Sequence, residues 1–184
     1  MEYLSYITVC HLSSFPIVNQ IFRHFLLCYL FLFYTMERQA AYMRNALFDQ
    51  GYLDEQFLQL EDLQDEVNPN FVEEVVKLFY TDSVRLIRSI ELTLENTPWD
   101  FEKLDKIMHQ FKGSSSSIGA KRVKKECTQF QEYCKVGNFD GCMREFQEVK
   151  QEHAALKRKL ENYFQVFLVV HVGIHLSVYW EKKW

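Results

Sequence analysis

Apolar residues in the middle of the chain recur at intervals of three and four, the spacing of one helical face. The longest such pattern consists of Phe71, Val75, Phe79, Leu86, Ile90 and Leu94. The same spacing returns from Leu104 to Phe111, from Val123 to Cys134 and from Cys142 to Phe164. The pattern therefore predicts four helices, each of about 15 to 25 residues.

Helix starters and stoppers separate these four segments. Asn68-Pro69 precedes the first segment, and Thr97-Pro98 or Asp100 opens the second. Gly119 and Gly137 follow the second and third segments, as is typical of helix C-termini. Short connections favour antiparallel neighbours, so we predict an all-α fold built on an antiparallel four-helix bundle.

Two short additional N-terminal helices are predicted ahead of the bundle. The first covers Glu37 to Gln50 and is stopped by Gly51. The second begins after Asp54, whose side chain can cap it. Its apolar positions are Phe57, Leu60 and Leu63. We expect these two helices to cover one end or one side of the bundle.

Composition agrees with one helical domain and argues against other classes. The chain has 184 residues, 48% of them hydrophobic and 25% charged, which is ordinary for one globular domain with terminal extensions. Six glycines and three prolines are too few for the many tight turns of a sandwich or barrel. The net charge of −4 gives no electrostatic argument for nucleic acid, so we expect no nucleic-acid partner.

Cysteine and histidine spacing indicates neither a disulfide scaffold nor a metal centre. The five cysteines are an odd number and form no CxxC pair. Cys127 and Cys134 would lie about 10 Å apart along a helix, too far to bridge, and we interpret them as core residues in a reducing compartment. His171 and His175 are four apart, but no carboxylate or cysteine is close in the chain, so we expect no metal site.

Composition changes abruptly near both ends of the chain. Residues 1–35 include the apolar run Phe25 to Tyr34, which is too short to span a bilayer and makes a poor signal peptide. Residues 166–184 include a run rich in Val, Leu and aromatic residues, from Val166 to Tyr179, that we predict to be strand-like. We therefore divide the chain into an extension (1–35), a domain (36–165) and a tail (166–184).

Three interpretations of the N-terminal extension stay open: a non-native translated segment ahead of a natural start at Met36, an added packing helix, and a membrane anchor. The sharp change of composition at Met36 favours the first. The tail receives the same interpretation, and we expect no membrane partner.

The segment from Met108 to Ala120, MHQFKGSSSSIGA, contains a glycine and a serine run of low helix propensity. A glycine inside a helix costs about 1 kcal/mol relative to alanine, and serines are weak helix formers. Successive residues turn by about 100°, which places His109, Lys112, Gly113 and Ser116 on one stripe, mostly opposite the apolar residues. The imidazole of His109 is therefore predicted to be exposed.

This stripe suits the acceptance of a phosphoryl group. A neutral imidazole has a free lone pair and is a competent nucleophile. Lys112 can offset the charge of the arriving group, and Gly113 leaves room for a partner's loop. For most of the serine run we favour a packing role. The chain has no phosphate-binding loop, nucleophile elbow or HExxH motif, so a partner would have to supply the remaining catalytic groups.

Charge is also distributed unevenly. Five cations and no acid lie between Lys112 and Lys125, and this basic run could attract an acidic partner. Nine acids and no Lys or Arg lie between Asp49 and Glu74, which we interpret as a solvated face.

The segment HQFKGSSSSIGAKRV, from His109 to Val123, resembles the signature of plant histidine-containing phosphotransfer (HPt) proteins, intermediates of cytokinin-type multistep phosphorelays. The likeness covers about Met36 to Gln165 and includes LFDQGYLDEQF and NPNFVEEVVKLFYTDS. It implies the HPt domain, a four-helix bundle with extra N-terminal helices. It also implies a role in a two-component regulatory system of the cytoplasm and nucleus.

By this resemblance, His109 would take a phosphoryl group from the receiver-domain aspartate of a hybrid histidine kinase and pass it to a response-regulator aspartate. Lys112 and Gly113 match the family's supporting positions, and Gln110 and Ser116 are predicted to support the phosphoryl group or docking. The receiver would supply Mg²⁺, so the chain would be a phosphocarrier with no cofactor of its own and no autonomous catalytic activity.

Some plant relatives have lost the histidine and act as inhibitors, whereas this chain retains it. The alternative to a phosphocarrier is an adaptor that binds receiver domains without transferring a phosphoryl group, because its terminal extensions obstruct the site.

Overall fold

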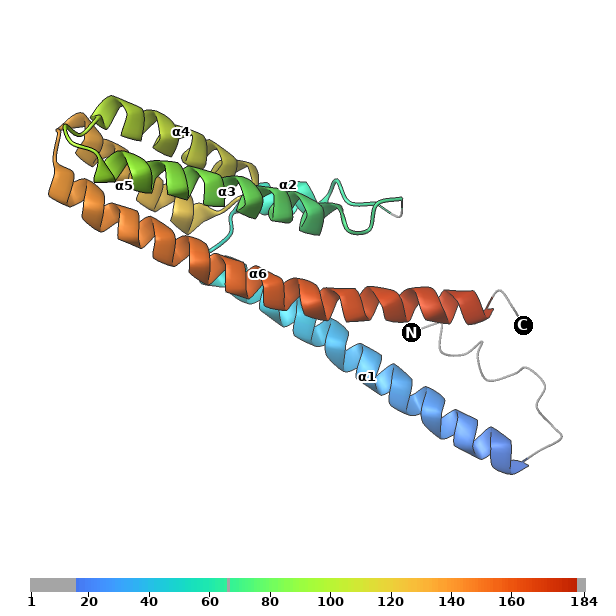
Figure 1. Ribbon diagram of the computed structural model, residues 1–184. Helices are drawn as coiled ribbons and strands as arrows, with labels where there is room; N and C mark the ends of the chain where they lie inside the picture. Colours follow the sequence, from blue (N-terminus) through green and yellow to red (C-terminus); the bar gives the residue numbers. More distant parts are fainter. Residues whose placement is uncertain (1–15, 66, 182–184) are drawn as a thin grey trace. The chain divides into compact units, whose positions relative to one another are not determined.

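The computed structural model describes residues 16–65 and 67–181, and within these ranges it contains helices and connections but no strand (Figure 1). One isolated antiparallel bridge joins Leu53 to Ala120. The helices are α1 (Pro16–Asp49), α2 (Glu55–Glu61), α3 (Phe71–Glu95), α4 (Phe101–Ser117), α5 (Lys121–Lys135) and α6 (Phe139–Glu181). The predicted all-α class is confirmed.

Helices α3, α4, α5 and the first part of α6 lie side by side as the predicted antiparallel bundle (Figure 1). Each helix contributes its apolar stripe to one core. Side chains with almost no exposed surface include Leu86, Ile90, Leu104, Met108, Phe111, Phe130, Phe146 and Leu156. The spacing of threes and fours in the sequence therefore identified the buried face of α4, α5 and α6. In α3 it identified the residues from Phe79 onward, whereas Phe71 and Val75 are only half-buried and their neighbours Val72 and Val76 are buried.

Several predicted helix boundaries are confirmed by their caps. The side chain of Asp100 accepts a hydrogen bond from the backbone N–H of Lys103 at 2.9 Å, which caps α4. Asp54 does the same for α2 through the N–H of Gln56 at 3.0 Å. Helix α2 ends at Glu61, however, so the prediction that Leu63 belongs to it is wrong, and Leu63 is 67% exposed.

The first helix is much longer than predicted. Helix α1 is continuous from Pro16 to Asp49, and the predicted helix Glu37 to Gln50 is only its C-terminal part. No glycine or proline lies between Ile17 and Asp49, so the change of composition at Met36 does not interrupt the helical hydrogen bonds.

The prediction of a strand-like tail is wrong. Helix α6 continues through Val166 to Tyr179 and ends at Glu181. A strand needs a partner for its backbone N–H and C=O groups, and the described residues offer no other strand. A helix satisfies these groups within the segment itself, so β-branched residues do not prevent it here.

The chain divides into two compact units. One is Ala41–Gln165, which contains the whole bundle, and the other consists of the described parts of Met1–Ala40 and Val166–Trp184. None of the helices in the described ranges has a stretch long and apolar enough to cross a membrane.

Candidate functional site

His109 lies in the second half of α4, on the face opposite the core. Its neighbours Met108 and Phe111 are completely buried, whereas its own side chain is exposed, as predicted. No residue in the described part of the chain makes a hydrogen bond to its ring. Both ring nitrogens are therefore open to a partner molecule.

Lys112 lies one turn after His109 and is held in place from α5. Its ammonium nitrogen Nζ donates to Oε1 of Gln131 at 3.1 Å. The Gln131 amide then donates from Nε2 to Oδ1 of Asp105 at 2.9 Å. The glutamine side chain is only 6% exposed, so two neighbouring helices fix the position of the ammonium group beside the imidazole.

Gln131 is a site residue that the sequence reasoning missed. It follows Cys127 by four and precedes Cys134 by three, so it occupies a position on the apolar stripe of α5. A polar residue at such a position needs a buried hydrogen-bond partner. That signal could have identified it, although the sequence alone does not identify Lys112 as the partner.

Gly113 is exposed and lies in regular helix. A Cβ atom added there would meet nothing within 4 Å. The packing of this chain therefore gives no reason for a residue that costs about 1 kcal/mol relative to alanine in a helix. The open space beside His109 is consistent with the close approach of another molecule.

The four serines after Gly113 bond back to their own helix. Ser114 and Ser115 donate to the carbonyl of Phe111 at 3.0 and 2.7 Å, and Ser117 donates to that of Ser114 at 2.8 Å. Ser116 donates to the carbonyl of Lys112 at 2.8 Å. All four hydroxyl protons are thus in use, and the complete burial of Ser115 agrees with the packing role favoured for the run.

Gln110 is exposed next to His109 and faces α3. It lies at one end of a groove of about 320 Å³ between α3 and α4, together with Lys103 and Ile107. Of the four predicted supporting residues, Lys112, Gly113 and Ser116 follow one another along the His109 stripe, and Gln110 lies to the side of it.

Gly119 and Ala120 position the helices around the site. Gly119 has φ of +68°, and a Cβ atom there would lie 2.7 Å from the backbone nitrogen of Phe57. Its carbonyl accepts from the N–H of Asp54 at 3.0 Å, and the N–H of Lys121 donates to the carbonyl of Tyr52 at 3.0 Å. This end of the signature therefore holds the α1–α2 connection against α4 and α5.

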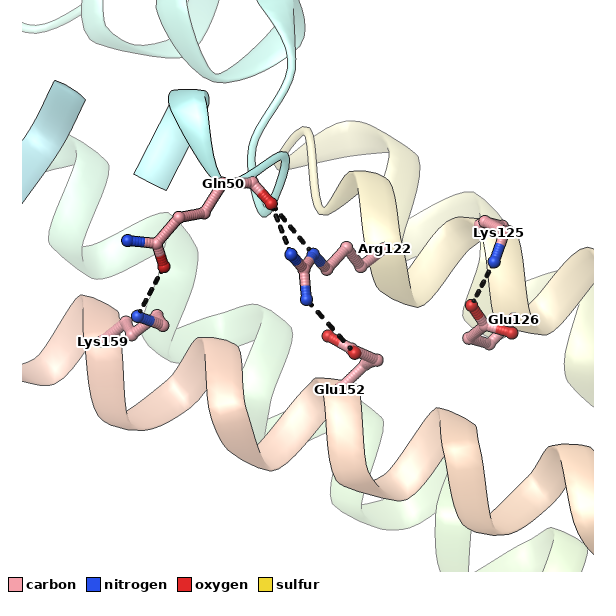
Figure 2. A network of polar contacts seen from close by, with 6 residues as sticks. All are labelled: Gln50, Arg122, Lys125, Glu126, Glu152 and Lys159. Carbon is pink, nitrogen blue, oxygen red and sulfur yellow. Dashed lines mark hydrogen bonds and ion pairs between the residues drawn. The ribbon is translucent and has the colours of Figure 1, made fainter. Parts of the chain in front are cut away.

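Arg122 also holds this connection (Figure 2). Its guanidinium donates to the carbonyl of Gln50 from Nε at 3.1 Å, lies over the ring of Tyr52 and pairs with Glu152 at 3.5 Å. Lys159 donates to the Gln50 side chain at 2.9 Å. Arg122 is thus committed to internal contacts and caps the C-terminal end of α1.

The predicted basic run is therefore only partly available to a partner. Arg122 is engaged as described, and Lys125 pairs with Glu126 at 2.9 Å (Figure 2). Lys121 and Lys124 are exposed and have no ion pair within the described residues. These two cations on the first turn of α5 are free of internal ion pairs in the described residues and would be directly available to an acidic partner.

A second histidine of the bundle has the opposite environment. His153 of α6 is 7% exposed, and its Nε2 lies 2.7 Å from Oγ of Ser83 in α3. The rings of Phe79, Tyr80 and Phe111 surround it. Burial, and secondarily the charge of Lys157, lowers the pKa of His153 from 6.5 to about 4, so the ring is neutral and closed to partners at neutral pH.

No group of three or more potential metal ligands occurs in the part of the chain that the structure describes. The side chains of His171 and His175 lie outside the described residues, so the expectation that they form no metal site stays a prediction.

A helical bundle that exposes a histidine in mid-helix, with an ammonium group one turn away, has the architecture expected of a histidine phosphotransfer domain. Residues 74–159 match the family model described as the Hpt domain.

Two relatives extend this match beyond residues 74–159. The chain is 62% identical over 116 residues to histidine-containing phosphotransfer protein 4 of Arabidopsis thaliana, covering 63% of this chain and 91% of the relative. It is 58% identical over 132 residues to pseudo histidine-containing phosphotransfer protein 5 of rice, covering 72% and 87% respectively. The chain therefore belongs to the family of plant histidine-containing phosphotransfer proteins.

Crystal structures of family members have the same fold. A histidine-containing phosphotransfer protein from Medicago truncatula matches with a TM-score of 0.71 and 40% identity, covering 74% of this chain and 93% of that one. A maize protein of the same name matches with a TM-score of 0.70 and 38% identity, covering 73% and 99%.

Proposed function

We propose that this chain is a phosphorelay intermediate of cytokinin signalling. His109 accepts a phosphoryl group from the receiver-domain aspartate of a hybrid histidine kinase and passes it to the aspartate of a response regulator. The observation that carries the proposal is the exposed imidazole without a hydrogen-bond partner in the described part of the chain, beside a fixed ammonium group, in a chain of this family.

The transfer follows from the groups present. A nitrogen of the His109 ring attacks the phosphorus of the aspartyl phosphate, a P–N bond forms, and the P–O bond to the aspartate breaks and leaves a carboxylate. The second step reverses these bonds on another receiver. Lys112, one turn after His109, would offset the phosphoryl charge, and its hydrogen bond to Gln131 would hold the ammonium group in place.

The partner supplies the rest of the chemistry. Receiver domains would contribute Mg²⁺ and an acidic pocket, so the chain needs no cofactor of its own and has no autonomous catalytic activity. Gln110, Gly113 and Ser116 would lie under the docked receiver, and Lys121 and Lys124 would attract its acidic surface. We place this exchange in the cytoplasm and the nucleus.

A pair of matched substitutions tests the role of His109. His109→Gln removes the acceptor, and His24→Gln changes another exposed histidine, on α1. We expect no phosphoryl transfer from a phosphorylated receiver to the first variant and an unchanged rate for the second, with equal helical circular dichroism. If His109→Gln is labelled at the rate of the unchanged chain, the assignment is wrong.

The alternative function is a receiver-binding adaptor that transfers nothing. It is favoured by one observation: a rice relative with 58% identity is named a pseudo phosphotransfer protein. A transfer assay that compares the full chain with residues 36–165 separates the two. Transfer by both supports a carrier, and transfer by the short form alone supports obstruction by the extensions.

A further inference from the structure

Two buried cysteines touch at the corner between α5 and α6. Cys134 lies in the last turn of α5 and Cys142 in the first turn of α6. Their sulfur atoms are 3.6 Å apart, and the two side chains are 5% and 0% exposed. A disulfide requires about 2.0 Å between the sulfurs, so they would need to approach by only about 1.6 Å.

A glycine brings the two helices this close together. A Cβ atom at Gly141 would fall on the ring of Tyr133, so the α6 backbone lies directly against this aromatic side chain of α5. Arg144 fixes the ring by donating to the Tyr133 hydroxyl at 2.8 Å. Cys142 and Cys134 are the next residues along each helix, and the tight crossing places their sulfurs in contact.

The thiols at this corner are chemically different from the third buried cysteine. The hydrogen bond between them raises the pKa of Cys134 and lowers that of Cys142, so Cys142 is the more readily ionised of the two. Burial raises the pKa of Cys127 to about 12, and no sulfur contacts it in the described part of the chain. Cys127 is therefore a natural internal control.

We propose that Cys134 and Cys142 are an oxidation site that forms a reversible intramolecular disulfide in the presence of a peroxide. The Cys142 thiolate attacks one peroxide oxygen, the O–O bond breaks, and a sulfenic acid and hydroxide result. The Cys134 sulfur then attacks the sulfenic sulfur, an S–S bond forms, and water leaves with the Cys134 proton. Two thiols and one hydrogen peroxide thus give one disulfide and two waters.

The position of the pair allows access and reversal. Both cysteines lie in terminal turns, which open more readily than helix centres, and such local opening would give a small oxidant access to the buried sulfurs. A thiol such as glutathione reverses the reaction by thiol–disulfide exchange. The disulfide joins α5 to α6 at the end of the helix that carries Gln131, so it stiffens the support of Lys112 without touching His109.

The test uses the full chain with Cys10 and Cys28 changed to serine, which leaves the three buried cysteines. The protein is reduced, treated with hydrogen peroxide, denatured and labelled with iodoacetamide. We expect one reactive thiol instead of three, recovery of all three with glutathione, and a melting temperature raised by about 5 °C in the oxidised form.

Matched variants assign the bond. Trypsin separates residues 126–135, which contain Cys127 and Cys134, from residues 136–144, which contain Cys142. Cys127→Ala is expected to retain the cross-linked peptides, and Cys134→Ala to lose them. Three reactive thiols after peroxide, a cross-link that depends on Cys127, or sulfinic acid without a cross-link would each overturn the proposal. The thiol count and the cross-linked peptides are measured on the protein with all three buried cysteines, so they test the proposal even if Cys134→Ala does not fold.

Discussion

His109 and His153 lie on helices of the same bundle, and their surroundings give them different chemistry. The first is exposed and without a hydrogen bond from any described residue. The second is bonded to Ser83 and enclosed by aromatic rings. Sequence periodicity could separate them, because His109 falls on the polar side of its helix whereas His153 falls between the buried Val149 and Leu156.

The buried histidine makes stability depend on pH. Its pKa is 6.5 in the unfolded chain and about 4 in the fold, so acid favours the unfolded state. The free energy of unfolding is expected to be unaffected by this group above pH 6.5 and to fall by about 3 kcal/mol towards pH 4. Urea titrations from pH 7 to pH 4 measure this change, with His153→Gln as the variant that lacks the titrating ring. If both proteins show the same slope between pH 6.5 and pH 5, His153 is not responsible.

Gln131 is expected to affect transfer through Lys112. In Gln131→Ala the ammonium group loses its fixed partner, and a hydrogen bond to a charged group contributes about 1.5–3 kcal/mol. We expect the rate of phosphoryl transfer to fall about tenfold, which corresponds to about 1.4 kcal/mol. Stopped-flow or quenched transfer from a phosphorylated receiver measures it.

Two controls test whether Gln131 acts by positioning Lys112 or whether its removal disturbs the structure more generally. Gln129→Ala, on the exposed side of α5, should leave the rate unchanged. Adding Gln131→Ala to Lys112→Ala should cost little more than Lys112→Ala alone, because the two residues act together. Fully additive effects would show that Gln131 acts independently of the lysine.

The element that places α2 against the C-terminal end of α4 is the connection held by Gly119. Gly119→Ala forces an L residue into positive φ and drives a Cβ atom into the backbone of Phe57. Gly51→Ala is the matched control, because its φ is +70° but its Cβ would meet nothing within 4 Å. We expect Gly119→Ala to lower the free energy of unfolding by about 2 kcal/mol more than Gly51→Ala. Equal losses, measured by urea unfolding, would mean that the close approach contributes nothing.

Helix prediction succeeded where an apolar stripe and a cap agreed. Asp54 and Asp100 cap the helices that they were predicted to begin, and the stripes of α4 to α6 and that of α3 from Phe79 onward are buried. It failed in the tail after Val166, where β-branched residues suggested a strand. Strand formation depends on a neighbouring strand, and a single chain segment does not reveal whether one is present.

The site was predictable in its exposed part and not in its support. His109, Lys112 and Gly113 follow from position on one helix, which the sequence specifies directly. The contact of Lys112 with Gln131 joins two helices and depends on their rotation and separation. The contacts of Gly119 and Arg122 with the α1–α2 connection likewise join residues that are separated in the chain by three whole helices.

At the scale of the whole molecule, the proposed function divides the chemistry between proteins: the chain would present a nucleophile and a docking face, and its partners would hold the metal and the acceptor or donor carboxylates. The bundle unit Ala41–Gln165 contains every residue that the proposal uses. The idea that residues 1–35 and 166–184 are non-native stays a prediction. Mass measurement of the intact protein isolated from its natural source would decide it.

The most direct test of the central claim is to locate the phosphoryl group on the full chain. The protein is mixed with a phosphorylated receiver and Mg²⁺, digested with trypsin at alkaline pH and analysed by mass spectrometry and ³¹P NMR. The account predicts one acid-labile phosphoramidate on the peptide Ile107–Lys112, which contains His109. A phosphoryl group on any other residue, an acid-stable phosphoester, or no transfer at all would contradict it.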